Sequence, residues 1–216
     1  MPRGSIAGLC AIFIALVTAS FVKAQDVVDR IVARVENDII LLSDVQELQR
    51  YQELVNGKSE SESAILDRLI DQWIVRSEAE LSQFPKPKEA EIDREVLRVE
   101  KSFATPEEYQ ARKKQSGLSD AEVRKMVASQ LYLGSYLDSR FRPSAQVEEK
   151  AIEDFYQNKV VPKAKERGQA PPTLEAAHDT IQEALVQSGI NEQADRWLKE
   201  SRDRLDIQKY LEEGTK

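Results

Sequence analysis

The segment VDRIVARVENDIILLSDV, residues 28–45, contains two apolar patterns with different periods. Up to Leu42, branched apolar residues are interrupted by charged ones and by the polar pair Asn37-Asp38, which is typical of a short β-hairpin with a tight turn. From Ser43 the apolar spacing becomes helical, and Ser43 and Gln46 match a capping box. We therefore expect a hairpin over residues 27–42, with its turn at Asn37-Asp38, followed directly by a helix that Ser43 caps.

Helical spacing of apolar residues then continues through most of the chain. Helix ends are marked by Gly57, by two prolines near residue 86, by Gly117 and by Pro143, whereas Thr105-Pro106 and the box Ser119 to Glu122 mark helix starts. The expected helices cover about residues 43–54, 59–81, 89–102, 105–117, 119–141, 147–156 and 173–198.

Three segments deviate from this pattern. The segment 160–172 contains three prolines and a glycine among charged residues, so we expect a surface loop or linker. Gly189 could kink the last helix. The segment 206–211 could be a strand or a frayed tail, and as a strand it could pair with the hairpin, which alone would be marginally stable. The expected fold is mainly α, with an N-terminal hairpin and a C-terminal strand that pairs with it.

The first 24 residues resemble a secretory signal peptide. Arg3 precedes an uncharged, mostly apolar run over residues 7–22, and Val22-Lys23-Ala24 fits the site that signal peptidase accepts. The run is shorter than the ~20 apolar residues that a membrane-spanning helix requires. We expect cleavage after Ala24 and export to the periplasm, leaving one domain over residues 25–216. The alternative is an uncleaved membrane tether.

Composition excludes several functional classes. The chain has 216 residues, a formal net charge of −7, one histidine and one cysteine. An acidic chain is a poor candidate for nucleic-acid binding, because phosphate contacts require a basic face. We expect no bound cofactor and no metal, since Cys/His zinc sites and Cys–His nucleophile pairs need more of these residues. The single His178 is expected to be a partly exposed helix residue rather than a catalytic base.

The expected helix over residues 119–141 has apolar residues on two faces. One face carries Val123, Met126, Val127, Leu131, Leu137 and Phe141, and the other carries Tyr132, Leu133 and Tyr136. Such a helix is either buried on both faces or presents one face to unfolded chains, for which mobile methionine and amphipathic tyrosine are suited. The candidate peptide-binding residues are Met126, Tyr132, Leu133 and Tyr136. Trp73 and Trp197 continue apolar stripes, so we expect both in the core.

The hairpin followed by Ser43-Asp44 resembles the opening of the SurA-type periplasmic chaperones. The segments Ile65–Asp71, Phe141–Pro143 with Val147–Tyr156, and Asn191–Glu200 are similar to later parts of that family. The resemblance implies a helical, ATP-independent module in the envelope of a Gram-negative bacterium. Such a module would bind unfolded outer-membrane proteins.

The chain departs from that family in one respect. Relatives carry parvulin-type prolyl isomerase domains of roughly 100 residues where this chain has only the segment 160–172. The family's isomerase residues therefore have no counterparts here, and we expect no enzymatic activity. The alternatives are a degenerate prolyl isomerase relative and a membrane-tethered accessory subunit of the envelope.

Overall fold

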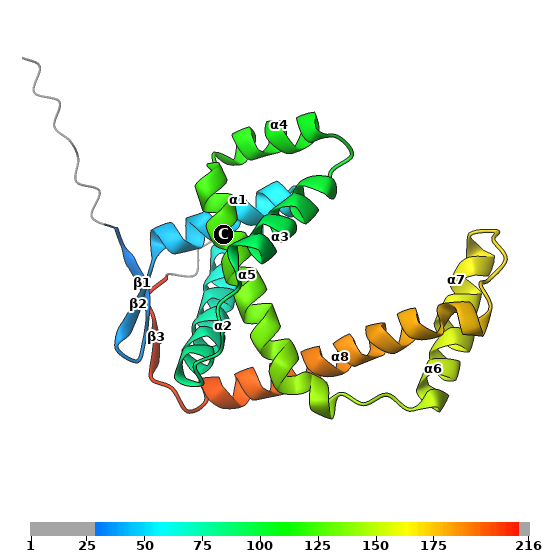
Figure 1. Ribbon diagram of the computed structural model, residues 1–216. Helices are drawn as coiled ribbons and strands as arrows, with labels where there is room; N and C mark the ends of the chain where they lie inside the picture. Colours follow the sequence, from blue (N-terminus) through cyan, green and yellow to red (C-terminus); the bar gives the residue numbers. More distant parts are fainter. Residues whose placement is uncertain (1–28, 212–216) are drawn as a thin grey trace, which may run out of the picture.

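In the computed structural model, which describes residues 29–211, a small antiparallel sheet joins segments from both ends of the chain (Figure 1). The elements in chain order are β1 (Ile31–Val35), β2 (Asp38–Leu41), α1 (Leu42–Asn56), α2 (Glu62–Leu81), α3 (Glu89–Lys101), α4 (Pro106–Ser116), α5 (Asp120–Phe141), η1 (Arg142–Ser144), α6 (Glu149–Phe155), the π-helix η2 (Tyr156–Val160), α7 (Val161–Glu166), α8 (Leu174–Arg202) and β3 (Ile207–Lys209). The mainly α fold is confirmed. The expected signal peptide, residues 1–24, lies outside the described residues.

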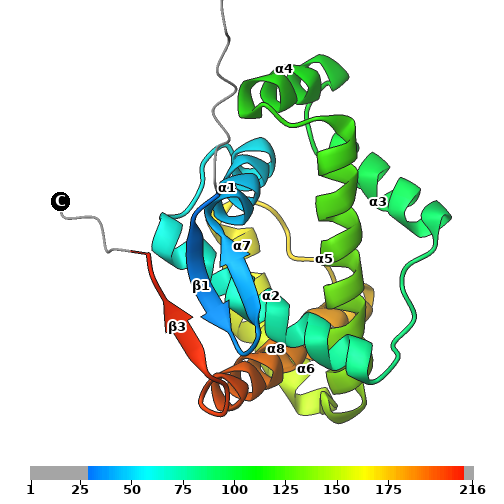
Figure 2. The same cartoon turned by 90° about the vertical axis from the view of Figure 1, so that its left-hand side faces the viewer.

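The sheet has the strand order β2-β1-β3, so the C-terminal strand pairs with the hairpin as expected (Figure 2). Ala33 of β1 lies opposite Ile40 on one side and Lys209 on the other. The Tyr210 amide donates to the Val32 carbonyl at 2.8 Å, and the Glu36 amide donates to the Asp206 carbonyl at 2.9 Å. The third strand gives β1 hydrogen-bonded partners on both edges, which an isolated hairpin lacks.

Two local predictions at the hairpin were wrong. The register pairs Val35 with Asp38, which places the turn at Glu36-Asn37, and it is Glu36 that has the positive φ, 53°. The first helix is not capped by Ser43. Instead, the Asp44 carboxylate accepts a hydrogen bond from the Leu41 amide at 2.9 Å, so the helix begins where β2 ends. An aspartate in the first turn is an alternative partner for an amide at the helix start.

The strongest start and stop signals around α4 and α5 are confirmed. Thr105 caps α4 and accepts from the Glu108 amide at 3.2 Å, with Pro106 as the first helical residue. Gly117 ends the helix with φ 68°, a conformation that glycine adopts without steric strain. Ser119 then caps α5 in a reciprocal box with Glu122.

The sheet, α1, α2 and α5 surround the main core, and we call these elements with α3 and α4 the body. The side chains without exposed surface in this core include Val32, Val35, Val45, Leu54, Ile65 and Ile70. Both tryptophans are half-buried rather than fully buried at the core edge. Trp73 donates from Nε1 to Asp38 at 2.8 Å, and the Trp197 ring lies 4.9 Å from the Arg140 guanidinium carbon. A polar or cationic partner at each ring explains why these side chains keep an exposed edge.

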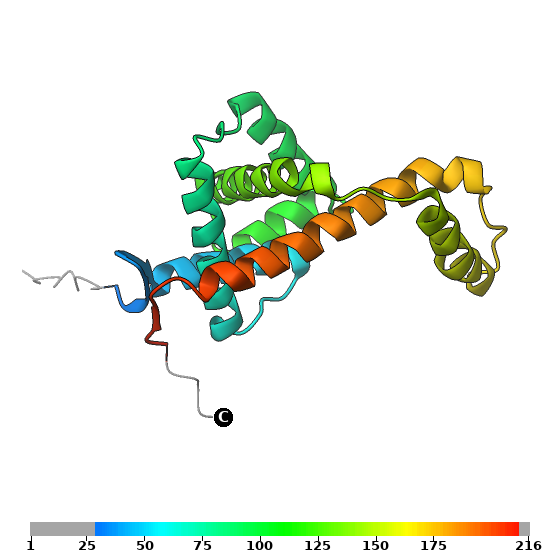
Figure 3. The same cartoon turned by 90° about the horizontal axis from the view of Figure 1, so that it is seen from below.

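A second unit, which we call the arm, consists of α6, η2, α7 and the first half of α8. It extends away from the body, and α8 runs from one to the other (Figures 1 and 3). The arm has its own apolar cluster around Ile152, Ala177 and Ile181. Where the arm leaves the body, Arg142 binds Glu183 of α8 and Asp138 of α5 with hydrogen bonds of 2.8–3.0 Å.

The arm corrects one expectation. Much of the segment 160–172 is helical, because α7 covers Val161–Glu166 and only the residues after it form a loop. Pro162 stands at the start of α7, directly after the π-helical turn η2. α8 is continuous through Gly189 to Arg202. A side chain at position 189 would come within 3.3 Å of the Ala145 Cβ, so glycine there allows the linker after η1 to pass close to α8.

Candidate functional site

The four residues predicted to bind peptides lie in the interior. Met126 is 9% exposed, Tyr132 and Leu133 are 7% exposed, and Tyr136 is 5% exposed. The last three pack against Val75 and Ala79 of α2 and against Phe84, whose ring centroid lies 5.5 Å from that of Tyr136. The expectation that these residues form an exposed apolar face is therefore corrected. The end of α2 and the segment after it cover this face of α5.

A different face of α5 lines an open groove, which we call the α5 groove. It has a volume of about 600 Å³ and is bounded by α1, α3, α5 and α8. Its lining residues are Tyr51, Glu95, Arg98, Val99, Val127, Gln130, Leu131, Gly134, Ser135, Asp138 and Gln187. A second hollow of about 530 Å³ shares Tyr51, Val99 and Gln130 with it and continues toward α2, so the concave surface extends across the body.

Gly134 is one of the residues that line the groove. It is an exposed glycine within α5, and a Cβ atom built on it would meet no atom within 4 Å. Glycine inside a helix is less favourable than alanine by about 1 kcal/mol. Glycine at this position therefore lowers helix stability, and it leaves the groove beside the helix open. Leu131 and Val99, which line the same groove, are half-buried and offer apolar contact to a ligand.

The polar groups of the groove are mostly uncharged or neutralised. The Arg98 guanidinium lies 2.6 Å from the Glu95 carboxylate, so these two charges largely compensate each other. Burial raises the pKa of the Tyr51 hydroxyl to about 12, with smaller contributions from Glu95 and Tyr109, and Tyr51 therefore stays neutral at physiological pH. Gln130 and Gln187 each carry a donor and an acceptor, which matches the alternating N–H and C=O groups of an extended backbone.

The described residues contain no group of three or more His, Cys, Asp or Glu side chains that could hold a metal ion. Within residues 29–211, no helix is both long and apolar enough to cross a membrane.

Neither a scan against models of known protein families nor a search of curated proteins found a match to this chain. The chemistry of the site therefore has to be inferred from its own residues, which provide apolar contacts and neutral hydrogen-bonding groups in an open groove.

His178 is a partly exposed helix residue, as expected, and it links two elements of the arm. Its Nε2 lies 3.1 Å from the Glu149 carboxylate of α6, and its Nδ1 lies 3.2 Å from Asp179. Hydrogen bonds first to Glu149 and then to Asp179 raise the pKa of His178 above its usual value of 6.5. Because the folded pKa is raised, these interactions stabilise the arm below pH 6.5, and the stabilisation is lost as the pH rises through the raised pKa.

NMR titration of the untagged chain tests this assignment directly, because the sequence contains only one histidine. We expect the His178 imidazole to titrate above pH 6.5, and Glu149→Gln to move its pKa back toward that value. Glu148→Gln is the matched control, since the Glu148 side chain makes no capping hydrogen bond and no ion pair within residues 29–211. A midpoint at or below 6.5 in the unmodified protein would contradict the prediction.

Proposed function

We propose that this protein is an ATP-independent chaperone that holds extended segments of unfolded polypeptides in the α5 groove. The observation that carries the proposal is the open space over Gly134, flanked by apolar and neutral polar side chains. Apolar contacts of this kind do not depend on client sequence, because the hydrophobic effect is non-directional. Neutral amides can bind the backbone, which is common to all clients.

The proposed site of action is the periplasm, and the proposed clients are outer-membrane proteins. Two features of the sequence support this. Residues 1–24 have the pattern of a cleavable signal, and the hairpin with the helix after it resembles the SurA-type chaperones. The proposed mechanism is passive. Each contact is weak, release is fast, and no covalent bond is made or broken.

An aggregation assay tests the function. An unfolded β-barrel outer-membrane protein is diluted from urea into buffer without ATP, with or without residues 25–216 of this chain, and light scattering is recorded. We expect scattering to fall as the chain approaches an equimolar ratio to the client, because a passive binder acts stoichiometrically. An unrelated acidic protein of similar size is the control.

Two outcomes would argue against the proposal. Scattering that is unchanged at a severalfold excess of this chain would show that it does not protect unfolded clients. Acceleration of a proline-limited refolding reaction at catalytic concentrations of the chain would instead indicate an isomerase.

A further inference from the structure

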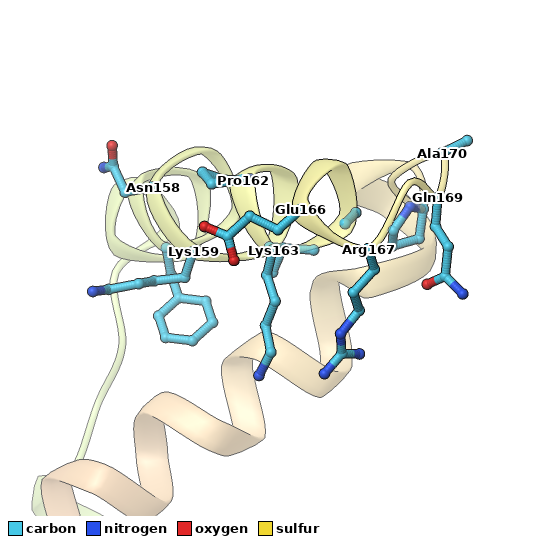
Figure 4. A pocket seen from close by; sticks show the side chains of 12 residues that line it. Asn158, Lys159, Pro162, Lys163, Glu166, Arg167, Gln169 and Ala170 are labelled. Atoms are coloured by element: carbon cyan, nitrogen blue, oxygen red, sulfur yellow. The ribbon is translucent and has the colours of Figure 1, made fainter.

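The arm contains a separate cavity, with a volume of about 770 Å³, that shares no lining residue with the α5 groove. The cavity is built on η2, α7 and the loop after them (Figure 4). Phe155, Val160, Ala164 and Pro172 give it an apolar part. Lys159, Lys163 and Arg167 add three cations to its lining, against one carboxylate, Glu166. The cavity therefore combines apolar surface with an excess of positive charge.

The three cations are exposed and have no acidic partner among residues 29–211. Some cations elsewhere in the chain are neutralised by such partners, for example Arg34, Arg124, Arg142 and Arg202, which each bind a carboxylate. The whole chain has a net charge of −7, yet residues 156–173 contain four basic residues and only one acidic residue. Positive charge is thus concentrated in the short segment that lines the cavity, which makes the cavity complementary to an anionic ligand.

The backbone at this cavity is also irregular. Tyr156–Val160 forms a π-helical turn between α6 and α7, and three of its residues line the cavity: Asn158, Lys159 and Val160. Such turns are rare and occur frequently at functional sites, because they change the direction of side chains relative to a regular α-helix. The Tyr156 hydroxyl donates to the Pro172 carbonyl at 2.6 Å and fixes the loop beside this turn.

The spacing of the cations indicates the form of the ligand. Lys159, Lys163 and Arg167 are each four residues apart, with Lys159 in η2, Lys163 in α7 and Arg167 directly after α7. In a regular α-helix this spacing corresponds to a rise of about 6 Å. Figure 4 shows Lys163 and Arg167 extending from the same side of the helix. In an extended polypeptide, side chains on one face recur every second residue, at about 6.6 Å. Carboxylates at alternate positions of an extended chain would therefore match the three cations one to one.

We propose that the arm cavity binds extended acidic segments of polypeptides, with Asp or Glu at alternate positions and an apolar residue next to them. The carboxylates pair with Lys159, Lys163 and Arg167, and the apolar residue contacts the part of the cavity around Phe155. This inference deepens the proposed function, because it names a class of client segment that the arm selects while the α5 groove holds less specific segments.

The test is peptide binding followed by fluorescence anisotropy. The probe is a labelled peptide with the sequence Glu-Ser-Glu-Ser-Glu-Leu, and the same peptide with Gln in place of Glu is the ligand control. We expect the double variant Lys163→Glu/Arg167→Glu to weaken binding of the acidic peptide about tenfold, since two exposed ion pairs are replaced by two repulsions. Binding by the unmodified chain should also weaken as salt is added.

The matched protein control is Lys150→Glu/Lys165→Glu. It makes the same change of charge on the same arm, but neither residue lines the cavity. We expect its affinity for the acidic peptide to stay within about twofold of the unmodified chain, since it leaves the three cations in place. Equal weakening by the two double variants would overturn the proposal, as would equal affinity for the Glu and Gln peptides. Binding to anionic lipid vesicles without binding to the peptide would assign the cavity to a membrane surface instead.

The two sites can fail independently. Lys163→Glu/Arg167→Glu is expected to keep the suppression of aggregation of a client without acidic segments, because the α5 groove is unchanged. If the unmodified chain suppresses aggregation but does not bind the acidic peptide, the arm proposal fails and the proposed function stands. If it binds the peptide but suppresses the aggregation of no client, the proposed chaperone function fails and the binding of acidic segments by the arm stands.

Discussion

Replacing Gly134 by tryptophan is expected to abolish the suppression of client aggregation while leaving the free energy of unfolding within about 1 kcal/mol of the original. The substitution places an indole in the α5 groove, where a Cβ atom meets nothing within 4 Å. The helix itself should tolerate the change, because position 134 is exposed and tryptophan is a better helix former than glycine. Light scattering measures the function, and urea denaturation followed by circular dichroism measures the stability.

Gly134→Ala is the matched control. It also removes the glycine, but a single methyl group leaves most of the groove of about 600 Å³ open. We expect this variant to gain about 0.5–1 kcal/mol of stability and to protect clients as well as the unmodified chain. The groove would be ruled out as the binding site if Gly134→Trp folded normally and still suppressed aggregation. Loss of function in both variants would show that glycine is required for backbone flexibility rather than for space.

The features that sequence predicted correctly depend on interactions within one helical turn or on neighbouring strands. The Thr105 cap and the Gly117 end are of this kind. The Thr105 hydroxyl accepts a hydrogen bond from an amide in the first turn, and the positive φ of Gly117 ends the helix within its last turn. The pairing of β3 with the hairpin was predictable because an isolated hairpin is marginally stable. The π-helical turn carries no comparable signal in the sequence.

The candidate site was less predictable, because it depends on which helix face a distant segment covers. The apolar pattern of α5 shows two faces, but it does not say that Phe84 and the end of α2 pack on one of them. One local signal was available. Gly134 stands inside a helix that is otherwise rich in good helix formers, and an unfavourable glycine there indicates that space is needed. Similarly, Pro162 by itself predicts a loop. A proline can also stand at the start of a helix, as Pro162 does in α7, and the sequence does not distinguish the two cases.

Leu133→Ala is expected to lower the free energy of unfolding by about 2–4 kcal/mol. Leu133 is 7% exposed and packs with Val75, Ala79 and Tyr136 between α2 and α5. Truncation removes these contacts and leaves a cavity, because neighbours in a closely packed interior relax only in part. The measurement is urea denaturation at equilibrium, with the change taken from the transition midpoint at constant slope.

Leu97→Ala makes the same truncation on α3, where Leu97 is 50% exposed, and it should change stability by no more than about 0.5 kcal/mol. This pair of variants separates the two interpretations of α5. If Leu133→Ala matched Leu97→Ala in stability, the face with Met126, Tyr132, Leu133 and Tyr136 would be open to solvent and available to clients. If Leu133→Ala is strongly destabilising but still suppresses aggregation at a temperature where it remains folded, that face serves only the core. Client binding then belongs to the opposite side of the helix, over Gly134.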